Sequence, residues 1–448
     1  HGGAAVGDGV VDGGLDEALY ARIRDSGLAH LLAISGLHMG LVASLIFAGS
    51  RLLLACFERL ALYRPIKKWA AVLAFAGISF YLLLSGAPVS AQRAYVMTSL
   101  VLLAVLVDRR ALSLRTVAWA AMVVLLLRPE SLLSAGFQMS FAAVTVLVAL
   151  YEGAPLRGFS LRLSASLPGR VLLYFCLLLV TTVAATLATA PFVWFHFGGG
   201  AAYGLLANLL AVPLMGFVIM PLGLLALLLM PFGGDGPILG LMGQAIALVV
   251  EIASLVADLP HARWTAVPPA LASLLLVTFG GLWLCLWSGR LRQAGILLVM
   301  AAAALLPLRQ LPDIQLAGNG RLLAFRSEDN RLLFSSLRRE GVSRAQWLER
   351  AGGMPAGDWA GEGEALTCDP AGCILTLRGF RISLLRSLSA LAEDCRRADL
   401  ILLPNRPLAR RICPQAPPAL DLFDRLSRGG AAIYLDAKAT GSQIRIDY

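Results

Sequence analysis

Charged side chains are scarce in this 448-residue sequence. Asp, Glu, Lys and Arg make up 15% of it, whereas soluble globular chains contain about 25%. Apolar residues make up 58%, and the mean hydropathy is +0.74. Seven cysteines are too few for a disulfide-dense secreted module, and the high apolar fraction excludes a disordered chain. The composition therefore predicts a polytopic membrane protein.

Several enzyme signatures are also missing. The sequence has no Gly-Lys-Ser/Thr phosphate-binding loop, which excludes an ATP motor within this chain. It has five histidines and none after His261. A serine hydrolase using Ser35 with His38 is a disfavoured alternative, because Ala33 stands where a Gly-x-Ser-Gly pattern needs glycine. We therefore expect no enzyme activity, no cofactor and no metal.

The first residues carry no start signal. The sequence begins at His1 without Met, and residues 1–14 are rich in glycine with no apolar run. This beginning lacks the features of a signal peptide. We expect residues 1–27 to be an external flank that continues an upstream region of a longer protein.

Ten apolar segments are candidates for membrane spans, each of which needs roughly 20 residues or somewhat fewer with sheltered ends. Several are short, and Pro213 and Pro221 interrupt the seventh. We expect a membrane domain over residues 28–311 with about ten spans, some short or broken. The segments are Ala29–Gly49, Trp69–Ser85, Ala94–Val107, Thr116–Leu127, Phe137–Leu150, Val171–Ala190, Leu205–Met230, Ile238–Ala257, Pro269–Trp287 and Ala294–Leu306.

Basic residues are distributed unevenly between the loops. With the N-terminus outside, the cytoplasmic loops carry 13 Lys and Arg residues and the opposite inter-helix loops carry 3. The positive-inside rule favours this orientation. An even number of spans then places residues 312–448 outside as well, in the periplasm of a bacterial cell.

Residues 312–448 read as a small soluble α+β domain, because short β-rich runs alternate with helical patterns. Ser343 is a plausible helix N-cap. The predicted strands are Arg321–Arg326, Arg331–Ser336, Ile374–Leu377, Arg381–Leu385, Leu400–Leu403, Ala431–Leu435 and Ile444–Tyr448, and the predicted helices are Ser343–Ala351, Leu388–Arg397 and Leu420–Leu426.

Four cysteines fall in this domain: Cys368, Cys373, Cys395 and Cys413. Cys368 and Cys373 flank the turn Asp369–Gly372 and could bridge two short strands, which leaves Cys395 with Cys413. Metal ligation is the competing interpretation, but the spacings match no zinc pattern. We favour two disulfides, in agreement with an external domain.

The first span contains an unusual polar run, His30–Gly40. Polar groups at membrane depth tend to face a bundle interior or a wet path. Ser35 and His38 can share one helix face, and Gly36 and Gly40 form a small-xxx-small pair that allows close helix approach. A local break in the helix is the alternative.

This run, HLLAISGLHMG, resembles the signature of the ComEC competence-protein family. Gly136–Phe141, GFQMSF, is similar to a second family motif, and Leu206–Leu214, LANLLAVPL, to a third. His196–Gly198 resembles the family's short turn between them. The resemblance covers residues 14–311 and implies an inner-membrane channel that passes single-stranded DNA into the cytoplasm during natural transformation.

The sequence departs from the family at its end. Many members carry a metallo-β-lactamase-like domain with an HxHxDH metal motif, which is absent here, so nuclease activity by that route is unsupported. The tail looks more like the metal-free tail of some proteobacterial members. The resemblance implies single-stranded DNA, the bilayer, an external DNA receptor and a cytoplasmic motor or single-strand-binding protein as partners.

A DNA path must be wet and polar but bind weakly. Arg93 could attract phosphate or anchor the helix at the interface, and Asn208 could line a broken helix or make an interhelical hydrogen bond.

We expect Glu251, seven residues after Gln244 on the same face, to be buried and hydrogen-bonded. The expected lining residues are His30, Ser35, Gly36, His38, Gln92, Arg93, Gln138, Ser140, His196, Asn208 and Pro213. The alternative function is transport of a small molecule or ion.

Overall fold

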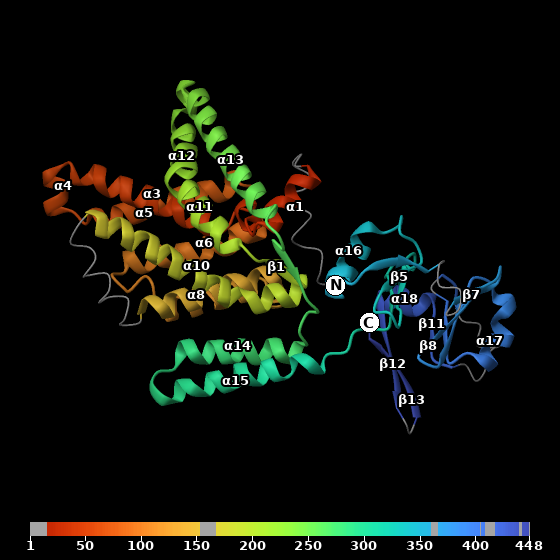
Figure 1. Cartoon of the computed structure of the whole chain (residues 1–448). Helices are drawn as coiled ribbons and strands as arrows, with labels where there is room; N and C mark the ends of the chain where they lie inside the picture. Colours follow the sequence, from red (N-terminus) through yellow and green to blue (C-terminus); the bar gives the residue numbers. More distant parts are fainter. Residues whose placement is uncertain are drawn as a thin grey trace. The chain divides into compact units, whose positions relative to one another are not determined.

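The computed structural model describes residues 16–152, 167–359, 366–403, 405–407, 417–438 and 441–447. The chain divides into two compact units (Figure 1). Unit 1 runs to Trp264 and includes Pro269–Leu306, and unit 2 comprises Thr265–Pro268 and the chain from Pro307. Unit 1 is built of apolar helices and unit 2 of sheets and helices, which confirms the predicted fold class.

Each of the ten predicted spans contains helix. Among the described residues, seven helices are long and apolar enough to cross a membrane, while α7 and α14 are apolar but shorter, with 14 and 16 residues. The helices of unit 1 beyond the first interrupted segment are α4 (Glu58–Tyr63), α5 (Ile66–Leu84), α6 (Val89–Leu106), α7 (Leu114–Leu127), α8 (Ala135–Glu152), α10 (Leu167–Phe197), α11 (Gly204–Leu214), α12 (Met220–Leu229), α13 (Asp235–Ala257), α14 (Leu271–Leu286) and α15 (Gln293–Ala304).

The first predicted span is interrupted. Helix α2 (Ala29–Leu32) ends before Ala33, which is extended with φ −83° and ψ 140°. Helix α3 (Gly36–Ala55) then begins, with Ser35 as its N-cap residue. The structure therefore has the local helix break that was the alternative prediction. Ser35 is at the start of a helix and not within a continuous one.

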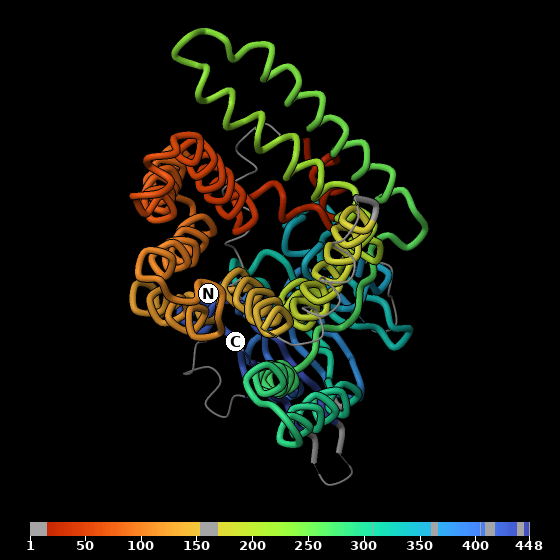
Figure 2. The backbone as a smooth tube through the Cα atoms, turned by 90° about the vertical axis from the view of Figure 1, so that its left-hand side faces the viewer, coloured from red at the N-terminus to blue at the C-terminus, as the bar shows by residue number. Residues whose placement is uncertain are grey.

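The seventh span shows the opposite outcome. We expected Pro213 and Pro221 to break it, but α11 passes into a π-helical turn at Met215–Ile219 and then into α12. A proline lacks the N–H for the ordinary helical bond, and a π turn accommodates the resulting mismatch without ending the helix. Helices α12 and α13 form a hairpin that rises from the rest of unit 1 (Figures 1 and 2).

The segment before the first span is also structured from Asp16. Helix α1 (Glu17–Asp25) begins after Asp16, whose carboxylate accepts the Ala18 N–H at 3.4 Å. Ile23 of α1 is buried in a cluster that includes Ala253 and Val256 of α13. No apolar periodicity marked this helix in the sequence, because it buries only one residue, Ile23, within a charged stretch.

Glycines allow close helix contacts, but at other positions than expected. At Gly36 and Gly40 no neighbouring atom lies within 4 Å of an added Cβ, so the predicted close approach there is wrong. Both lie in the first two turns of α3, and α3 meets α5 further along, where Ile46 fills the space beside Gly77. Gly280 of α14 and Gly295 of α15 form a second close contact, each against the other's carbonyl oxygen.

The described strands form a short ribbon and two sheets. The ribbon pairs β1 (Gly199–Ala201) with β2 (Arg263–Thr265). One sheet of unit 2 has the order β13-β12-β3-β4-β5-β6 and the other β11-β10-β9-β8-β7. Their strands are β3 (Ile314–Leu316), β4 (Leu323–Arg326), β5 (Leu332–Phe334), β6 (Ala356–Asp358), β7 (Leu366–Cys368), β8 (Gly372–Leu377), β9 (Phe380–Leu385), β10 (Leu400–Leu402), β11 (Ala419–Leu420), β12 (Ala431–Lys438) and β13 (Gly441–Asp447).

The two sheets of unit 2 pack face to face. Alternate residues of each strand point inward, so Ile314 and Phe325 of one sheet share a core with Ile382 and Leu400 of the other. Helix α16 (Gly341–Arg350) covers the outer face of the first sheet through Trp347. Helix α17 (Leu391–Arg397) covers that of the second. The result is a helix–sheet–sheet–helix arrangement.

Most predicted strands and helices of unit 2 occur with shifted ends. The predicted Ser343 N-cap is wrong, because α16 begins at Gly341 after Glu340. The predicted third helix is α18 (Leu422–Arg428), with Asp421 as its N-cap. Strands β3, β6, β7 and β11 were not predicted, because they have only two or three residues each and therefore show no clear alternation of apolar and polar residues.

A buried carboxylate links the strands of the first sheet. Asp313 is 3% exposed, and its Oδ1 lies 2.7 Å from Arg326 and 3.3 Å from Arg378. Its Oδ2 accepts the Leu435 N–H at 2.8 Å. A buried charge needs this number of partners, so Asp313 ties β12 to β4 next to β3.

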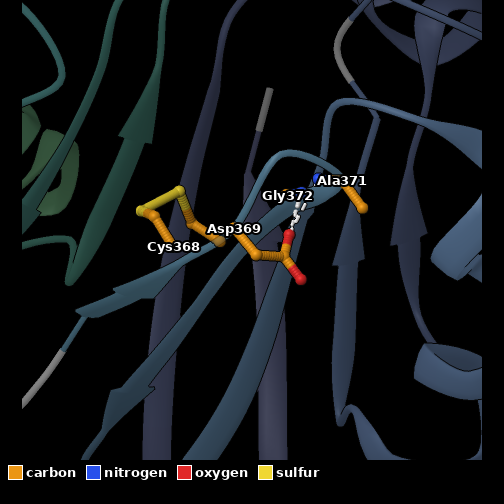
Figure 3. The surroundings of a disulfide bond; sticks show 5 residues. Cys368, Asp369, Ala371 and Gly372 are labelled. Carbon is orange, nitrogen blue, oxygen red and sulfur yellow. Dashed lines mark hydrogen bonds between the residues drawn. A yellow bond between two sulfur atoms is a disulfide. The ribbon is translucent and has the colours of Figure 1, made fainter.

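Cys368 and Cys373 form a disulfide between directly paired residues of β7 and β8. Figure 3 shows the turn between them, in which Asp369 Oδ1 accepts the N–H groups of Ala371 and Gly372, both at 2.8 Å. Cys395 is also disulfide-bonded. Cys413 lies outside the described residues, so its pairing with Cys395 stays a prediction.

Candidate functional site: a polar cluster at one end of the helix bundle

The candidate residues of unit 1 lie at one end of its bundle. Consecutive spanning helices joined by short loops run in opposite directions, so α3, α6, α8 and α11 begin at the end where α10 finishes. Arg93 is in the second turn of α6, Gln138 in the first turn of α8, and His196 in the last turn of α10. Residues far apart in sequence therefore gather at the same depth.

Gln138 and His196 are in direct contact. His196 Nε2 lies 2.8 Å from Gln138 Oε1, and Gln138 Nε2 donates to the Leu132 carbonyl at 3.0 Å. Phe137 and Phe141, on either side of Gln138 in the sequence, are buried against α7. This packing fixes α8 so that Gln138 reaches α10, where an amide and an imidazole form one polar pair.

Arg93 of α6 lies against α8 at Gly136. A Cβ added at Gly136 would be 2.7 Å from Arg93 Nη2, so a larger residue here would require the guanidinium to shift. In the described structure Arg93 Nε is buried and has no hydrogen-bond partner. An unsatisfied buried donor on a cation is costly, so this position favours an acceptor such as a phosphate oxygen.

Ser35 and His38 form a second, smaller group at the break before α3. His38 Nδ1 accepts the Ser35 N–H at 3.4 Å and lies 3.2 Å from Ser35 Oγ. His38 is buried, at 8% exposure. The pair therefore closes the first turn of α3 in the manner of a capping box, in which the residue three places on returns to the N-cap.

Two other expected lining residues bond locally. Gln92 Nε2 donates to the Ala87 carbonyl at 2.7 Å, across the turn in which Ala87 has a φ of 50°. His30 Nδ1 lies 3.0 Å from the Gly27 carbonyl. Gln92 and His30 thus hold the turns before α6 and α2. Ser140 is half-buried on α8.

Asn208 of α11 has a buried Oδ1 without a hydrogen-bond partner in the described structure. The described structure therefore shows no interhelical hydrogen bond to this oxygen, which was one of the two roles expected for Asn208. Pro213 lies within α11 just before the π turn, and the helix continues past it into α12.

Glu251 differs from expectation. We predicted a buried, hydrogen-bonded carboxylate, but Glu251 is exposed, as is Gln244. Helix α13 buries Ala245, Ala253 and Val256 on one face, and Glu251 falls on another because a residue turns by about 100° in a helix. Glu251 therefore lies apart from the polar cluster.

A cavity of about 840 Å³ lies between α3, α5, α12 and α13. Its lining is apolar apart from His38, Ser50 and Tyr81. Hydrocarbon side chains do not solvate phosphates, so this cavity is unsuited to a nucleic acid strand. His38 is the one expected lining residue that it shares.

No group of three or more His, Cys, Asp or Glu side chains that could hold a metal occurs within the part of the chain that the structure describes. The arrangement at the bundle end instead combines a cation, an amide and an imidazole. Of these, the guanidinium of Arg93 can hold an anion through charge-assisted hydrogen bonds. Sequence reasoning singled out Arg93, Gln138 and His196, but it missed the steric role of Gly136.

The helices and the polar cluster define a multi-pass α-helical membrane protein with ionisable side chains grouped at one end of its bundle. The chain belongs to the competence protein family, whose model matches residues 11–291. This match confirms the ComEC resemblance. The predicted boundaries between the flank, the membrane domain and the soluble domain stay predictions.

Two curated relatives match part of the chain. ComE operon protein 3 of Bacillus subtilis (strain 168) is 32% identical over 206 residues, which is 46% of this chain and 23% of that protein. Competence protein ComA of Neisseria gonorrhoeae is 34% identical over 187 residues, which is 40% of this chain and 26% of that protein. The matched region spans about a quarter of each relative's length. No solved structure gives a significant match.

Proposed function

We propose that this protein is a channel that passes single-stranded DNA across the bacterial inner membrane into the cytoplasm. Membership of the competence protein family supports a role in DNA uptake. The observation that carries the finer proposal is Arg93, a half-buried cation whose buried Nε lacks a partner in the described structure, at the same end of the bundle as the Gln138–His196 pair. Phosphates of a passing strand supply the missing acceptor.

The cluster suits transit because its contacts are few. A strand that moves must be attracted at the entrance and released at each step, which requires weak, repeated binding. One guanidinium with one amide and one imidazole provides such contacts, whereas a dense basic site would retain the strand. The strand passes without being cleaved, so the protein works as a conduit and not as an enzyme.

The orientation that we propose places the loops rich in Lys and Arg in the cytoplasm, according to the positive-inside rule. The polar cluster then faces the periplasm, and unit 2 lies on the same side. An external receptor delivers the strand. A cytoplasmic motor or single-strand-binding protein draws it in, because the sequence has no ATP-binding loop.

Natural transformation in a host that lacks its own channel tests this proposal. Gln138→Ala and His196→Ala are each expected to lower transformation by about tenfold or more at equal membrane levels, since a barrier increase of about 1.4 kcal/mol slows passage tenfold. DNA should still accumulate outside the inner membrane.

Thr189→Ala is the matched control, because the Thr189 hydroxyl bonds within α10 to the Ala185 carbonyl. It should transform like the wild type. Unchanged transformation in both cluster variants would contradict the assignment of Gln138 and His196 to the DNA path. No transformation by the well-expressed wild type would favour small-molecule or ion transport.

A further inference from the structure

The cavity between α3, α5, α12 and α13 plays no part in the proposed DNA path. Its volume is about 840 Å³, and its wall is apolar apart from His38, Ser50 and Tyr81. Within the described residues, no Lys or Arg lines it. Walls of this kind offer few hydrogen bonds to water and gain free energy by contact with hydrocarbon. The cavity therefore suits an apolar ligand.

The cavity opens on the outside of the helix bundle. Among its lining side chains, Leu53 is 68% exposed, Phe80 62% and Leu228 62%. These residues lie on helices that are long and apolar enough to cross a membrane, and the α12–α13 hairpin extends beyond its neighbours (Figure 2). The medium at the opening is then the hydrocarbon of the bilayer, from which an acyl chain enters without crossing water.

Two polar side chains lie at one end of the cavity. His38 is in the first turn of α3 and Tyr81 in the last turn of α5, and these two helices are in contact and run in opposite directions. The other end is apolar, with Leu53 in the last turn of α3 and Leu228 in the last turn of α12. The distance along α3 from His38 to Leu53 is about 22 Å at 1.5 Å per residue. One leaflet contributes about half of the 30 Å hydrocarbon core, so one acyl chain fits lengthwise.

Both polar side chains have a donor to spare. His38 Nδ1 accepts the Ser35 N–H, so a neutral His38 imidazole carries its proton on Nε2. In the described structure neither His38 Nε2 nor the Tyr81 hydroxyl has a hydrogen-bond partner. Each can therefore donate to a carbonyl oxygen. Phospholipids carry their ester carbonyls at the edge of the hydrocarbon core, which is the level of helix ends that cross it.

We propose that this cavity binds one acyl chain of a phospholipid, with the ester carbonyl of that chain accepting hydrogen bonds from His38 and Tyr81. The chain lies along α3 toward Leu53, and the head group stays outside the cavity. Because no cation lines the cavity, zwitterionic and anionic phospholipids bind alike. The inference concerns the lipid contacts of unit 1 and does not depend on the passage of DNA.

A spanning helix of a second copy of this chain is the competing occupant. Such a helix satisfies its backbone carbonyls internally, so it brings no free acceptor to His38 Nε2 and the Tyr81 hydroxyl. An ester carbonyl has no donor of its own in the hydrocarbon region and gains a hydrogen bond at this end of the cavity. The two donors therefore favour the lipid.

Native mass spectrometry of the full chain, released from detergent micelles with added palmitoyl-oleoyl phosphatidylglycerol, tests the site. The wild type should retain one lipid, with the same Kd for palmitoyl-oleoyl phosphatidylcholine. Gly49 lines the cavity and has no atom within 4 Å of an added Cβ. Gly49→Phe should therefore occupy the cavity and weaken the Kd at least about fivefold, the lower range for overpacking. Tyr81→Phe should weaken the Kd about twofold to tenfold, as loss of one hydrogen bond does.

Gly243→Phe is the matched control. Gly243 is also an exposed glycine of a spanning helix with no atom within 4 Å of an added Cβ, but it does not line the cavity. Its Kd should equal that of the wild type. No retained lipid in the wild type, an unchanged Kd in both Gly49→Phe and Tyr81→Phe, or an equal loss in Gly243→Phe would overturn the proposal. A two-chain mass that Gly49→Phe reduces to one chain would assign the cavity to a second copy instead.

The lipid site and the channel are tested separately. Gln138 does not line the cavity, so Gln138→Ala should keep the lipid Kd of the wild type while it lowers transformation. Failure of the channel proposal would leave the Kd effect of Gly49→Phe in place, and failure of the lipid site would leave the transformation defect of Gln138→Ala.

Discussion

The Arg93 guanidinium lies in the space that a side chain at position 136 would occupy. Gly136 leaves the space that Arg93 occupies beside α8. The guanidinium therefore stays at the level of Gln138 and His196 at the bundle end. Sequence reasoning could select these three polar residues because each is costly inside a membrane. It could not pair them, since 58 residues separate Gln138 from His196 and only the fold brings them together.

Gly136→Ala should displace the guanidinium while it leaves every polar group of the cluster present. Because the added Cβ would sit 2.7 Å from Arg93 Nη2, we expect transformation to fall by about tenfold or more, as a barrier increase of about 1.4 kcal/mol produces. Gly40→Ala is the control, with no atom within 4 Å of its added Cβ. Equal transformation by both variants would show that the position of Arg93 is immaterial.

At the scale of elements, apolar runs predicted the positions of the helices well and their interruptions poorly. The proline pair at Pro213 and Pro221 suggested a break, yet neighbouring backbone adjusts into a π turn and the helix continues. The break falls instead before Gly36, where Ser35 and His38 satisfy a new helix start. Burial was also hard to predict from the sequence. Glu251 was expected to be buried, but it is exposed because α13 packs through another face, which carries Ala245, Ala253 and Val256.

The contact between α14 and α15 gives a prediction about packing. A Cβ at Gly280 would lie 2.9 Å from the Gly295 carbonyl oxygen, and backbone atoms cannot turn aside. We expect Gly280→Ala to destabilise the protein by about 1–3 kcal/mol, the usual cost of overpacking, as a lower thermal midpoint in detergent. Gly281→Ala adds its Cβ to open space and should leave the midpoint unchanged, and a similar decrease in both variants would refute the contact.

At the scale of the whole molecule, composition and charge distribution predicted a membrane unit followed by an α+β unit. The packing of two sheets between helices was beyond the sequence pattern, because several strands have three residues or fewer. Asp313 shows the same limit, since no sequence pattern marks it, yet it joins β3, β4 and β12 from a buried position. The competence family assignment came from ordered motifs, and unit 2 lies mainly beyond that match.

The most direct measurement of the channel is photo-crosslinking of DNA that is stalled in transit. A photoreactive amino acid would replace Ser140, which shares a face of α8 with Gly136 four residues earlier, and in a second variant Leu187, which is 69% exposed on α10. A single strand blocked at its trailing end should crosslink from position 140 and not from position 187. Crosslinks from neither position, or equally from both, while transformation continues would contradict passage of DNA through the polar cluster.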